Sequence, residues 1–289
     1  MAEITSNLIK ELREKTSAGM MDCKKALEET GGDLEAASDW LRQKGIVKAA
    51  KKADRVAASG LVTAVFEGNI ACVVEVNAET DFVAKNDKFQ TLVTDIAAKA
   101  LASNGDFDAV DAATKDEVAN TIATIGENMS LRRIAKVEGD AVFTYVHNAI
   151  VPNMGQIGVA VAFNGDAAKL ADIGPKIAMH IAANKPEFLT IADVDPKAIE
   201  REKKIFIESG ATEGKPEQVA EKMTAGRIQK YYAESVLEEQ PYVMDPSKTV
   251  KQIVADNGGS LTGFACFVLG EGIEKREDNL ADEVSKMLG

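Results

Sequence analysis

The sequence has few aromatic residues, few cysteines and no long hydrophobic run. Aromatic residues make up 5% of the 289 residues, whereas hydrophobic residues reach 45% and alanine is conspicuous among them. Alanine has the highest intrinsic helix propensity, so we expect much of the chain to be helical. Because a domain usually has about 100–200 residues, we expect two or three compact units.

Cysteine is too sparse for a disulfide framework or a zinc site. Cys23, Cys72 and Cys266 are far apart in the sequence, odd in number and without a CxxC spacing. This pattern is typical of reduced thiols in a cytoplasm. No stretch approaches the about 18 apolar residues of a membrane span, and the N-terminus lacks the regions of a secretory signal. We therefore expect a cytoplasmic protein without a metal, a cofactor or a membrane partner.

Basic residues are also in deficit. The chain has 34 Lys and Arg against 46 Asp and Glu, a formal net charge of −12 and a pI of about 4.9. Phosphate backbones repel such a protein, which disfavours nucleic acid as the main partner. The exception is residues 42–55, with six basic residues and one acid. We interpret this segment as a partly helical linker, either a solvated tether or an electropositive strip that meets an acidic partner.

Sequence motifs of the common catalytic classes are missing as well. The nearest match to a phosphate-binding loop, residues 210–216, is one residue short and has Pro216 in place of the metal-binding hydroxyl. No HExxH or GxSxG occurs, and there are two histidines. We expect His180, in an apolar helix, to be a core residue and His147 to be a surface contact or edge residue. The chain therefore looks unlike an enzyme.

The hydrophobic pattern predicts an α+β fold that begins with a helical bundle. Three short helices are expected in residues 1–55: the first is capped by Thr5 or Ser6, the second spans about 20–29, and the third ends just before Gly45. Their expected core residues are Leu12, Leu27, Leu34 and Leu41.

From Ser59 onward the pattern predicts strands at 61–66 and 70–76 joined by a turn at 67–69, another strand at 129–138 and an alanine-rich helix at 169–184. One unit recurs in this part of the chain. Residues 70–77 align with residues 157–164 at an offset of 87, and the helix at 92–103 aligns with 173–184 at an offset of 81. We interpret this as a duplicated core of two small antiparallel sheets with helices. The expected domains are the bundle with the basic linker (1–55), the first core subdomain (56–140), the second core subdomain (141–186 and 229–270), an inserted antiparallel helical hairpin (187–228) and a C-terminal helical module (271–289).

The two copies differ in one connection. The offsets of 87 and 81 differ by six, so the first copy has six extra residues within 77–87. Loops on a rigid scaffold often carry function. An exposed Phe82 would contribute about 1.5–3 kcal/mol on entering a partner's pocket, and Asp81 could disturb the ligands of a nearby cation. The alternative is that Phe82 covers its own core while Asp81 caps the next helix.

Several motifs, in order along essentially the whole chain, resemble those of bacterial translation elongation factor Ts. Such an ordered set is far more specific than any one motif. The motifs are residues 16–27 (TSAGMMDCKKAL), Glu75-Val76-Asn77 followed by Thr80-Asp81-Phe82-Val83-Ala84, and residues 125–128 (IGEN), 178–183 (AMHIAA), 185–188 (KPEF) and 240–243 (QPYV).

The resemblance implies a guanine-nucleotide exchange factor that binds elongation factor Tu in its GDP-bound and nucleotide-free forms. The bundle would be a ubiquitin-associated-type docking module, and the hairpin a projecting coiled coil. Thr80, Asp81, Phe82 and Val83 would dislodge the partner's magnesium, with Asp81 and Phe82 as the wedge. Further partner-binding residues would be Met20, Met21, Lys24, Ile125, Gly126, His147, Val243 and Met244.

Three points stay open at this stage. The complex holds either one factor per GTPase or a dimer of such complexes. The alternative function is a non-catalytic scaffold that binds another helical partner through a ubiquitin-associated-type bundle. Residues 146–154 also depart from the family's pattern after His147.

Overall fold

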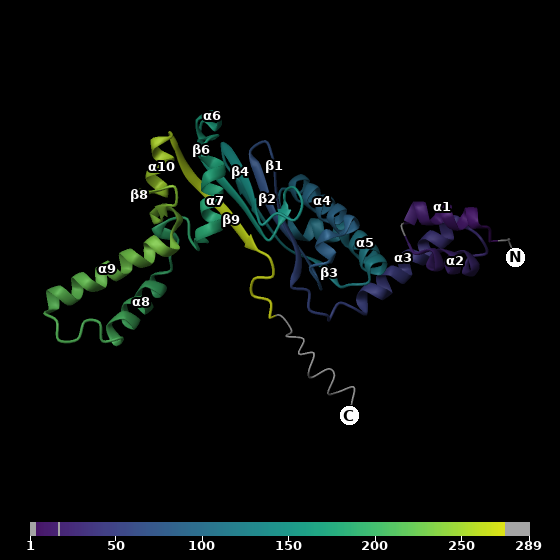
Figure 1. Cartoon of the computed structure of the whole chain (residues 1–289), viewed down its shortest axis with the longest axis horizontal. Helices are drawn as coiled ribbons and strands as arrows, with labels where there is room; N and C mark the ends of the chain where they lie inside the picture. Colours follow the sequence, from purple (N-terminus) through teal and green to yellow (C-terminus); the bar gives the residue numbers. More distant parts are fainter. Residues whose placement is uncertain (1–3, 17, 275–289) are drawn as a thin grey trace, which may run out of the picture. The chain divides into compact units, whose positions relative to one another are not determined.

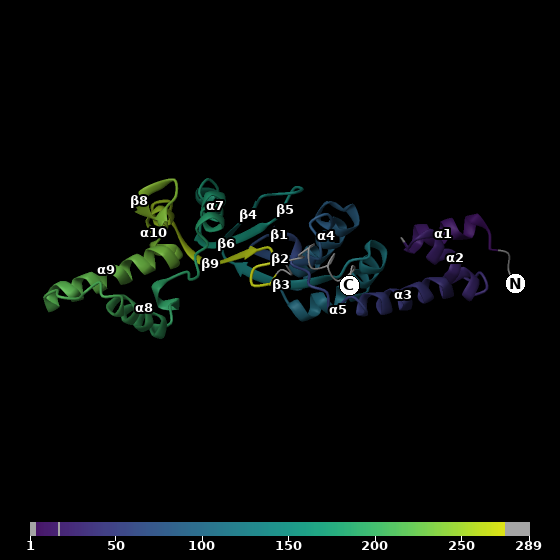
Figure 2. The same ribbon diagram turned by 60° about the horizontal axis from the view of Figure 1, so that its bottom comes forward.

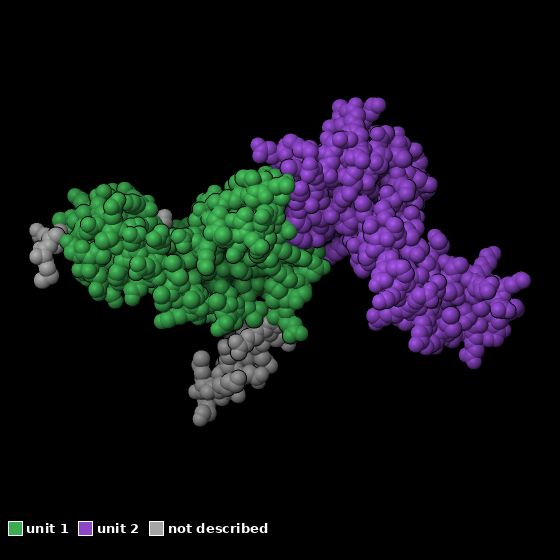
Figure 3. All heavy atoms as spheres, turned by 180° about the vertical axis from the view of Figure 1, so that it is seen from behind, with its two compact units in different colours: residues 1–62, 74–134, 268–289 green, residues 63–73, 135–267 purple. Residues whose placement is uncertain are grey.

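Residues 4–16 and 18–274 are described by the computed structural model. The expected C-terminal helical module, 271–289, lies outside the described residues from position 275 onward. Mixed helices and small antiparallel sheets confirm the predicted α+β class. Two compact units make up the chain (Figure 3): unit 1 contains residues 1–62, 74–134 and 268–289, and unit 2 contains residues 63–73 and 135–267.

Unit 1 begins with three short helices. The Thr5 hydroxyl accepts a hydrogen bond from the Leu8 amide at 3.3 Å, and Asp33 caps the third helix through two amides at 2.9 Å. Their core contains Leu12 and Leu27, with Leu34 and Leu41 partly buried against it, as predicted. The helices are α1 (Ser6–Thr16), α2 (Met20–Glu29) and α3 (Leu34–Ala50) (Figure 1).

Gly45 does not end the third helix, contrary to the sequence-based expectation. It lies buried inside α3, and a Cβ there would be 3.2 Å from Asn120 Oδ1 and 3.7 Å from the Ala123 Cβ. Both neighbours belong to α5 (Phe107–Ile125). Glycine costs about 1 kcal/mol in a helix interior, but here it lets α3 approach α5 closely.

The first sheet has four strands in the order β3-β2-β1-β5. The turn between β1 and β2 and the start of β3 lie where the sequence predicted them, whereas the short β5 was not predicted. The boundary between the two units passes through β1, β2 and β3. The elements are β1 (Ser59–Glu67), β2 (Ile70–Ala78), β3 (Met129–Glu138), β5 (Met154–Gly155) and the helix α4 (Asp87–Ala102) that follows β2.

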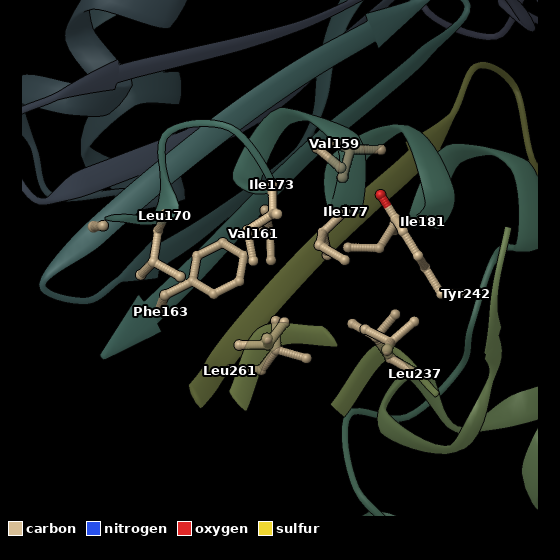
Figure 4. Packing of buried hydrophobic residues seen from close by; sticks show 14 of the residues in the cluster. Val159, Val161, Phe163, Leu170, Ile173, Ile177, Ile181, Leu237, Tyr242 and Leu261 are labelled. Atoms are coloured by element: carbon tan, nitrogen blue, oxygen red, sulfur yellow. The ribbon is translucent and has the colours of Figure 1, made fainter. Parts of the chain in front are cut away.

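The second sheet, in unit 2, has the order β4-β6-β9. Strands β4 (Ala141–His147) and β6 (Ile157–Gly165) pair antiparallel, and β9 (Gly259–Val268) returns from late in the chain to flank β6. Helix α7 (Gly174–Asn184) packs on this sheet. Figure 4 shows side chains of β6 and α7 directed toward one another and toward Leu237, Tyr242 and Leu261 in one buried apolar cluster.

The alanine-rich helix expected over residues 169–184 is broken in two. A single turn, α6 (Ala167–Leu170), ends before α7 starts at Gly174, with Pro175 in the first turn of α7. Proline has no amide hydrogen and its ring clashes with the carbonyl four residues earlier, so it belongs at a helix start and not in a helix interior.

The rest of unit 2 consists of a helical hairpin and a small group of elements in residues 237–256. Helices α8 (Pro196–Glu208) and α9 (Glu217–Ser235) run side by side (Figure 2), and Arg227 Nε donates to Glu202 Oε1 at 2.8 Å. Sequence reasoning missed α10, although its Thr249 and Gln252 form a capping box that is readable from the sequence. The remaining elements of unit 2 are β7 (Pro241–Tyr242), β8 (Asp245–Thr249), α10 (Val250–Asp256) and the short helices η2 (Ile191–Asp193) and η3 (Leu237–Glu239), whereas the short helix η1 (Val83–Lys85) belongs to unit 1.

Candidate functional site

The connection from β2 to α4, residues 79–86, is a loop anchored at its second half. Val83 and Ala84 are buried, and Gln90 Nε2 donates to the Ala84 carbonyl at 3.0 Å. Asn86 then caps α4 by accepting from the Lys88 amide at 3.0 Å. Val83 therefore anchors the loop and does not project from it.

The middle of the loop presents Asp81 and Phe82 to solvent, and we call these two residues the tip. The Phe82 residue is 80% exposed, the largest fraction among the exposed large hydrophobic residues of the described chain. Asp81 is also exposed. It caps neither following helix, because η1 has no side-chain cap and Asn86 caps α4. The alternative in which Phe82 covers its own core and Asp81 caps a helix is therefore wrong.

Thr80 is half-buried and is hydrogen-bonded to Glu127. Its amide donates to Glu127 Oε2 at 2.9 Å, and its hydroxyl donates to Glu127 Oε1 at 2.7 Å. In return, Glu79 Oε1 accepts from the Asn128 amide at 2.5 Å. Sequence reasoning assigned no role to Glu79 or Glu127, although Glu127 stands in the IGEN motif.

Ile125 and Gly126 form the corner that delivers Glu127 to the loop. Gly126 has a φ of +94°, in the left-handed region that favours glycine, and its amide donates to the Ile122 carbonyl at 2.8 Å. The Lys52 ammonium donates to the Gly126 carbonyl. The structure thus brings two sets of predicted site residues, the loop and this corner, together through Glu127.

The basic segment contacts the same corner. Asn128 Nδ2 donates to the Arg55 carbonyl at 2.7 Å and to the Ala53 carbonyl at 3.3 Å. Arg55 also lies 3.5 Å from Glu79 Oε1. Residues 52–55 therefore fasten to the base of the loop, which a solvated tether would not do.

A buried carboxylate stands beside the loop, on β2. Glu75 is fully buried and accepts from Arg132 at 2.9 Å, from Arg133 at 2.6 Å and from the Gly270 amide at 2.8 Å. Burial by itself would raise the pKa of Glu75, but these hydrogen bonds outweigh it and lower the pKa below its ordinary value. Asn77 Nδ2 adds a bond to Glu75 Oε1 at 3.0 Å. The end of β2 is thereby fixed where the loop begins.

Met20, Met21 and Lys24 lie on the first turns of α2. Both methionine side chains are exposed, and Lys24 pairs only weakly with Glu28, at 3.8 Å. Within the described residues, no hydrogen bond or ion pair connects these three side chains to the loop.

The remaining predicted site residues belong to unit 2. His147 is exposed at the end of β4, and its Nδ1 lies 3.0 Å from the Tyr145 hydroxyl. The stretch after it, which departs from the family's pattern, forms a tight loop with positive φ at Asn148 and Asn153. Val243 and Met244 are exposed between β7 and β8.

A buried histidine anchors the β7–β8 turn. His180 Nδ1 accepts from the Val243 amide at 3.2 Å, so its Nε2 carries the proton that bonds Gln240 Oε1 at 2.8 Å. Burial lowers the pKa of His180, although the Gln240 hydrogen bond acts in the opposite direction. His180 is the satisfied core histidine that the sequence predicted.

The described residues contain no cluster of metal-ligating side chains, and the Cys23 thiol is buried. Among residues 4–16 and 18–274, no group of three or more His, Cys, Asp or Glu side chains is arranged to hold a metal ion. Cys23 is buried, and burial raises the pKa of its thiol, which disfavours the reactive thiolate. None of the described helices is both long enough and apolar enough to cross a membrane.

Comparison with known proteins gives the family. The family model described as "Elongation factor TS" matches residues 79–271, which places the chain among the elongation factors. Proteins named elongation factor Ts are similar over their full lengths: that of Caulobacter vibrioides is 53% identical over 310 residues, covering 100% of this chain and 99% of the relative. That of Hyphomonas neptunium is 51% identical over 298 residues, covering 99% of both chains. The chain therefore belongs to the elongation factor Ts family.

Proposed function

We propose that the protein is a guanine-nucleotide exchange factor, which binds elongation factor Tu and promotes GDP release during translation elongation in the cytoplasm. Family membership supports the partner and the process. The observation that carries the proposal is the tip, a phenyl ring that is 80% exposed beside a carboxylate, on a loop anchored at both ends. An exposed ring held this firmly is suited to insertion into another protein.

Phe82 acts as the wedge in this mechanism. Burying the ring in an apolar pocket of the partner contributes about 1.5–3 kcal/mol, which offsets part of the cost of separating the partner's own elements. Asp81 enters beside it and perturbs the oxygen ligands of the magnesium ion. Since that ion helps to neutralise the nucleotide's phosphates, its displacement weakens GDP binding.

No bond is made or broken in this exchange. The exchange factor binds the nucleotide-free GTPase best. The exchange factor and the nucleotide therefore lower each other's affinity for the GTPase by the same ratio. The relative concentrations of GDP and GTP then decide which nucleotide rebinds. This role needs only a surface and a wedge.

The other modules extend the contact. We assign the α1–α3 bundle, through Met20, Met21 and Lys24, to docking as a ubiquitin-associated-type module, and Ile125 and Gly126 to the contact around the tip. His147, Val243 and Met244 would contact a second region of the partner, and the α8–α9 hairpin would be the family's coiled coil.

The proposal also includes a duplicated core, in which the two sheets arose from one repeated unit. Strand β6 spans the residues of β2 shifted by 87. In the first sheet β2 lies between β1 and β3, as β6 lies between β4 and β9 in the second, although β5 extends the first sheet beyond β1. Such agreement in length, order and offset supports an ancient repeat. One chain then already supplies two sheet units to a single GTPase.

The test is release of a fluorescent GDP analogue from elongation factor Tu. We expect wild type to accelerate release, and Phe82→Ala to reduce the acceleration by about tenfold or more, as expected from about 1.5–3 kcal/mol of lost burial. Asp81→Asn should give a smaller loss. Phe66→Ala is the matched control, because Phe66 is another exposed phenylalanine, on β1.

Two results would contradict the proposal in different ways. Absence of acceleration by wild type would exclude exchange and favour a non-catalytic scaffold. Full acceleration by both Phe82→Ala and Asp81→Asn would exclude the wedge and leave exchange to be explained by other contacts.

A further inference from the structure

We propose that Glu127 is a positioning residue for nucleotide exchange, and that it acts through a latch that fixes the tip before the partner arrives. The latch consists of Glu79, Thr80, Glu127 and Asn128. This inference rests on the proposed exchange function, and it names which residues of the chain prepare the wedge.

The latch is reciprocal. Glu127 accepts the amide and the hydroxyl of Thr80 at 2.9 and 2.7 Å, while Glu79 accepts the amide of Asn128 at 2.5 Å. Neighbouring residues of two segments, 47 positions apart, thus exchange hydrogen bonds in both directions. Hydrogen bonds to an ionised carboxylate are roughly twice as strong as neutral ones.

The tip lies between two fixed points. Thr80 is held by Glu127 on one side, and on the other Val83 and Ala84 are buried, with Gln90 bonded to the Ala84 carbonyl. Only Asp81 and Phe82 lie between these anchors. If the latch opens, the loop gains conformational freedom that must be lost again when the wedge binds.

The same latch joins the tip to Ile125 and Gly126, two of the predicted partner-binding residues of unit 1. Glu127 follows Gly126 directly, and the Lys52 ammonium donates to the Gly126 carbonyl. Loop and corner therefore present one rigid surface. A wedge must keep its shape while it displaces elements of the partner, so the latch should matter more for the release step than for initial docking.

The experiment compares Thr80→Val, Thr80→Ser and Glu127→Ala with wild type and with Glu117→Ala. Valine keeps the shape of threonine without its hydroxyl, serine restores the hydroxyl, and Glu117 is a carboxylate of α5 that pairs with Lys99. Hydrogen–deuterium exchange of residues 79–86 reports the latch in the free protein. The rate of GDP release at saturating factor and the half-saturating concentration report its role in exchange.

We expect faster deuterium exchange in residues 79–86 for Thr80→Val and Glu127→Ala, and wild-type protection for Thr80→Ser and Glu117→Ala. The saturating rate should fall about tenfold in Glu127→Ala and less in Thr80→Val, which keeps the amide hydrogen bond. Half-saturating concentrations should change less than the rates. The double variant should lose little more than Glu127→Ala alone, because both changes open the same latch.

Unchanged deuterium exchange in Thr80→Val and Glu127→Ala would overturn the latch. Faster deuterium exchange of the loop together with a wild-type saturating rate of GDP release would overturn the positioning role of Glu127. If Glu127→Ala does not fold, the comparison of Thr80→Val with Thr80→Ser tests the latch. If wild type does not accelerate release, the proposed function fails, while deuterium exchange still tests the latch separately.

Discussion

Strands β2 and β6 have the same length, and their residue numbers differ by 87 throughout. The polarity of their side chains nevertheless differs. Val74 and its counterpart Val161 are both fully buried. One position further, β2 has the buried carboxylate of Glu75, whereas β6 has Ala162. The second strand shows that the sheet itself does not need a buried charge at this position.

The connections that follow these strands differ as well. Eight residues, 79–86, separate β2 from α4, whereas Asp166 alone separates β6 from α6. The features common to both units are therefore the scaffold. Among the described residues, the buried charge network, the latch and the exposed tip belong to the first unit, and under the proposed function they adapt that unit for insertion into a partner.

Shortening the first connection to match the second should have the largest effect. We expect a variant in which one aspartate replaces residues 79–86 to lose all acceleration of GDP release, because it lacks the tip and both anchors. Circular dichroism and thermal unfolding check that the sheets persist. The double variant Asp81→Ser, Phe82→Ser, which keeps the loop length, should lose most of the acceleration. A folded, shortened variant that still accelerates release would place the active surface elsewhere.

Glu75→Ala gives β2 the residue that β6 has, and it should cause the largest loss of stability. It removes the buried carboxylate that Arg132 and Arg133 share, although Arg133 keeps its ion pair with Glu271 at 3.3 Å. Breaking a buried ion pair costs about 3–5 kcal/mol. Urea unfolding measures the loss. Glu138→Ala, which removes an exposed carboxylate paired with Lys136, is the control and should change little. A small effect of Glu75→Ala would mean that the network is dispensable in the first unit too.

The two units should also respond to acid in different pH windows, which is the smallest of these effects. His180 has a lowered pKa in the folded protein, so the unfolded chain binds its proton more readily. Stability from this group is complete above its ordinary pKa of 6.5 and declines as the pH falls toward the folded value. Glu75, also with a lowered pKa, loses its contribution only as the pH falls below 4.5.

Hydrogen–deuterium exchange at a series of pH values distinguishes the two windows. On acidification from pH 7, protection around α7 and β7 should weaken before protection around β2. In His180→Phe the early loss of protection around α7 and β7 should vanish. This variant should also be less stable at every pH, because the Val243 amide and Gln240 lose their hydrogen-bond partner. His147→Gln, which changes the exposed histidine, should retain the step. A first step in β2 would contradict the assignment to His180.

Much of the fold was readable from local sequence. The bounds of α2 and β3 were predicted closely, because apolar spacing and the flanking glycines and capping residues act over a few positions. The offset of 87 between the central strands also appeared in the sequence. Pro175 was a missed signal, since a proline there predicts a helix start. Gly45 was misread because its role depends on α5, more than 60 residues later.

The sequence by itself thus determined most of the secondary structure, the offset of 87 between β2 and β6 and the identity of the loop around Asp81 and Phe82. Only the tertiary structure decided that Phe82 faces solvent, that Thr80 turns toward Glu127 and that Glu75 meets the Gly270 amide, 195 residues later. Helix and strand patterns arise from neighbours along the chain, whereas these contacts arise from how the strands and helices pack. The exposed tip depends on both.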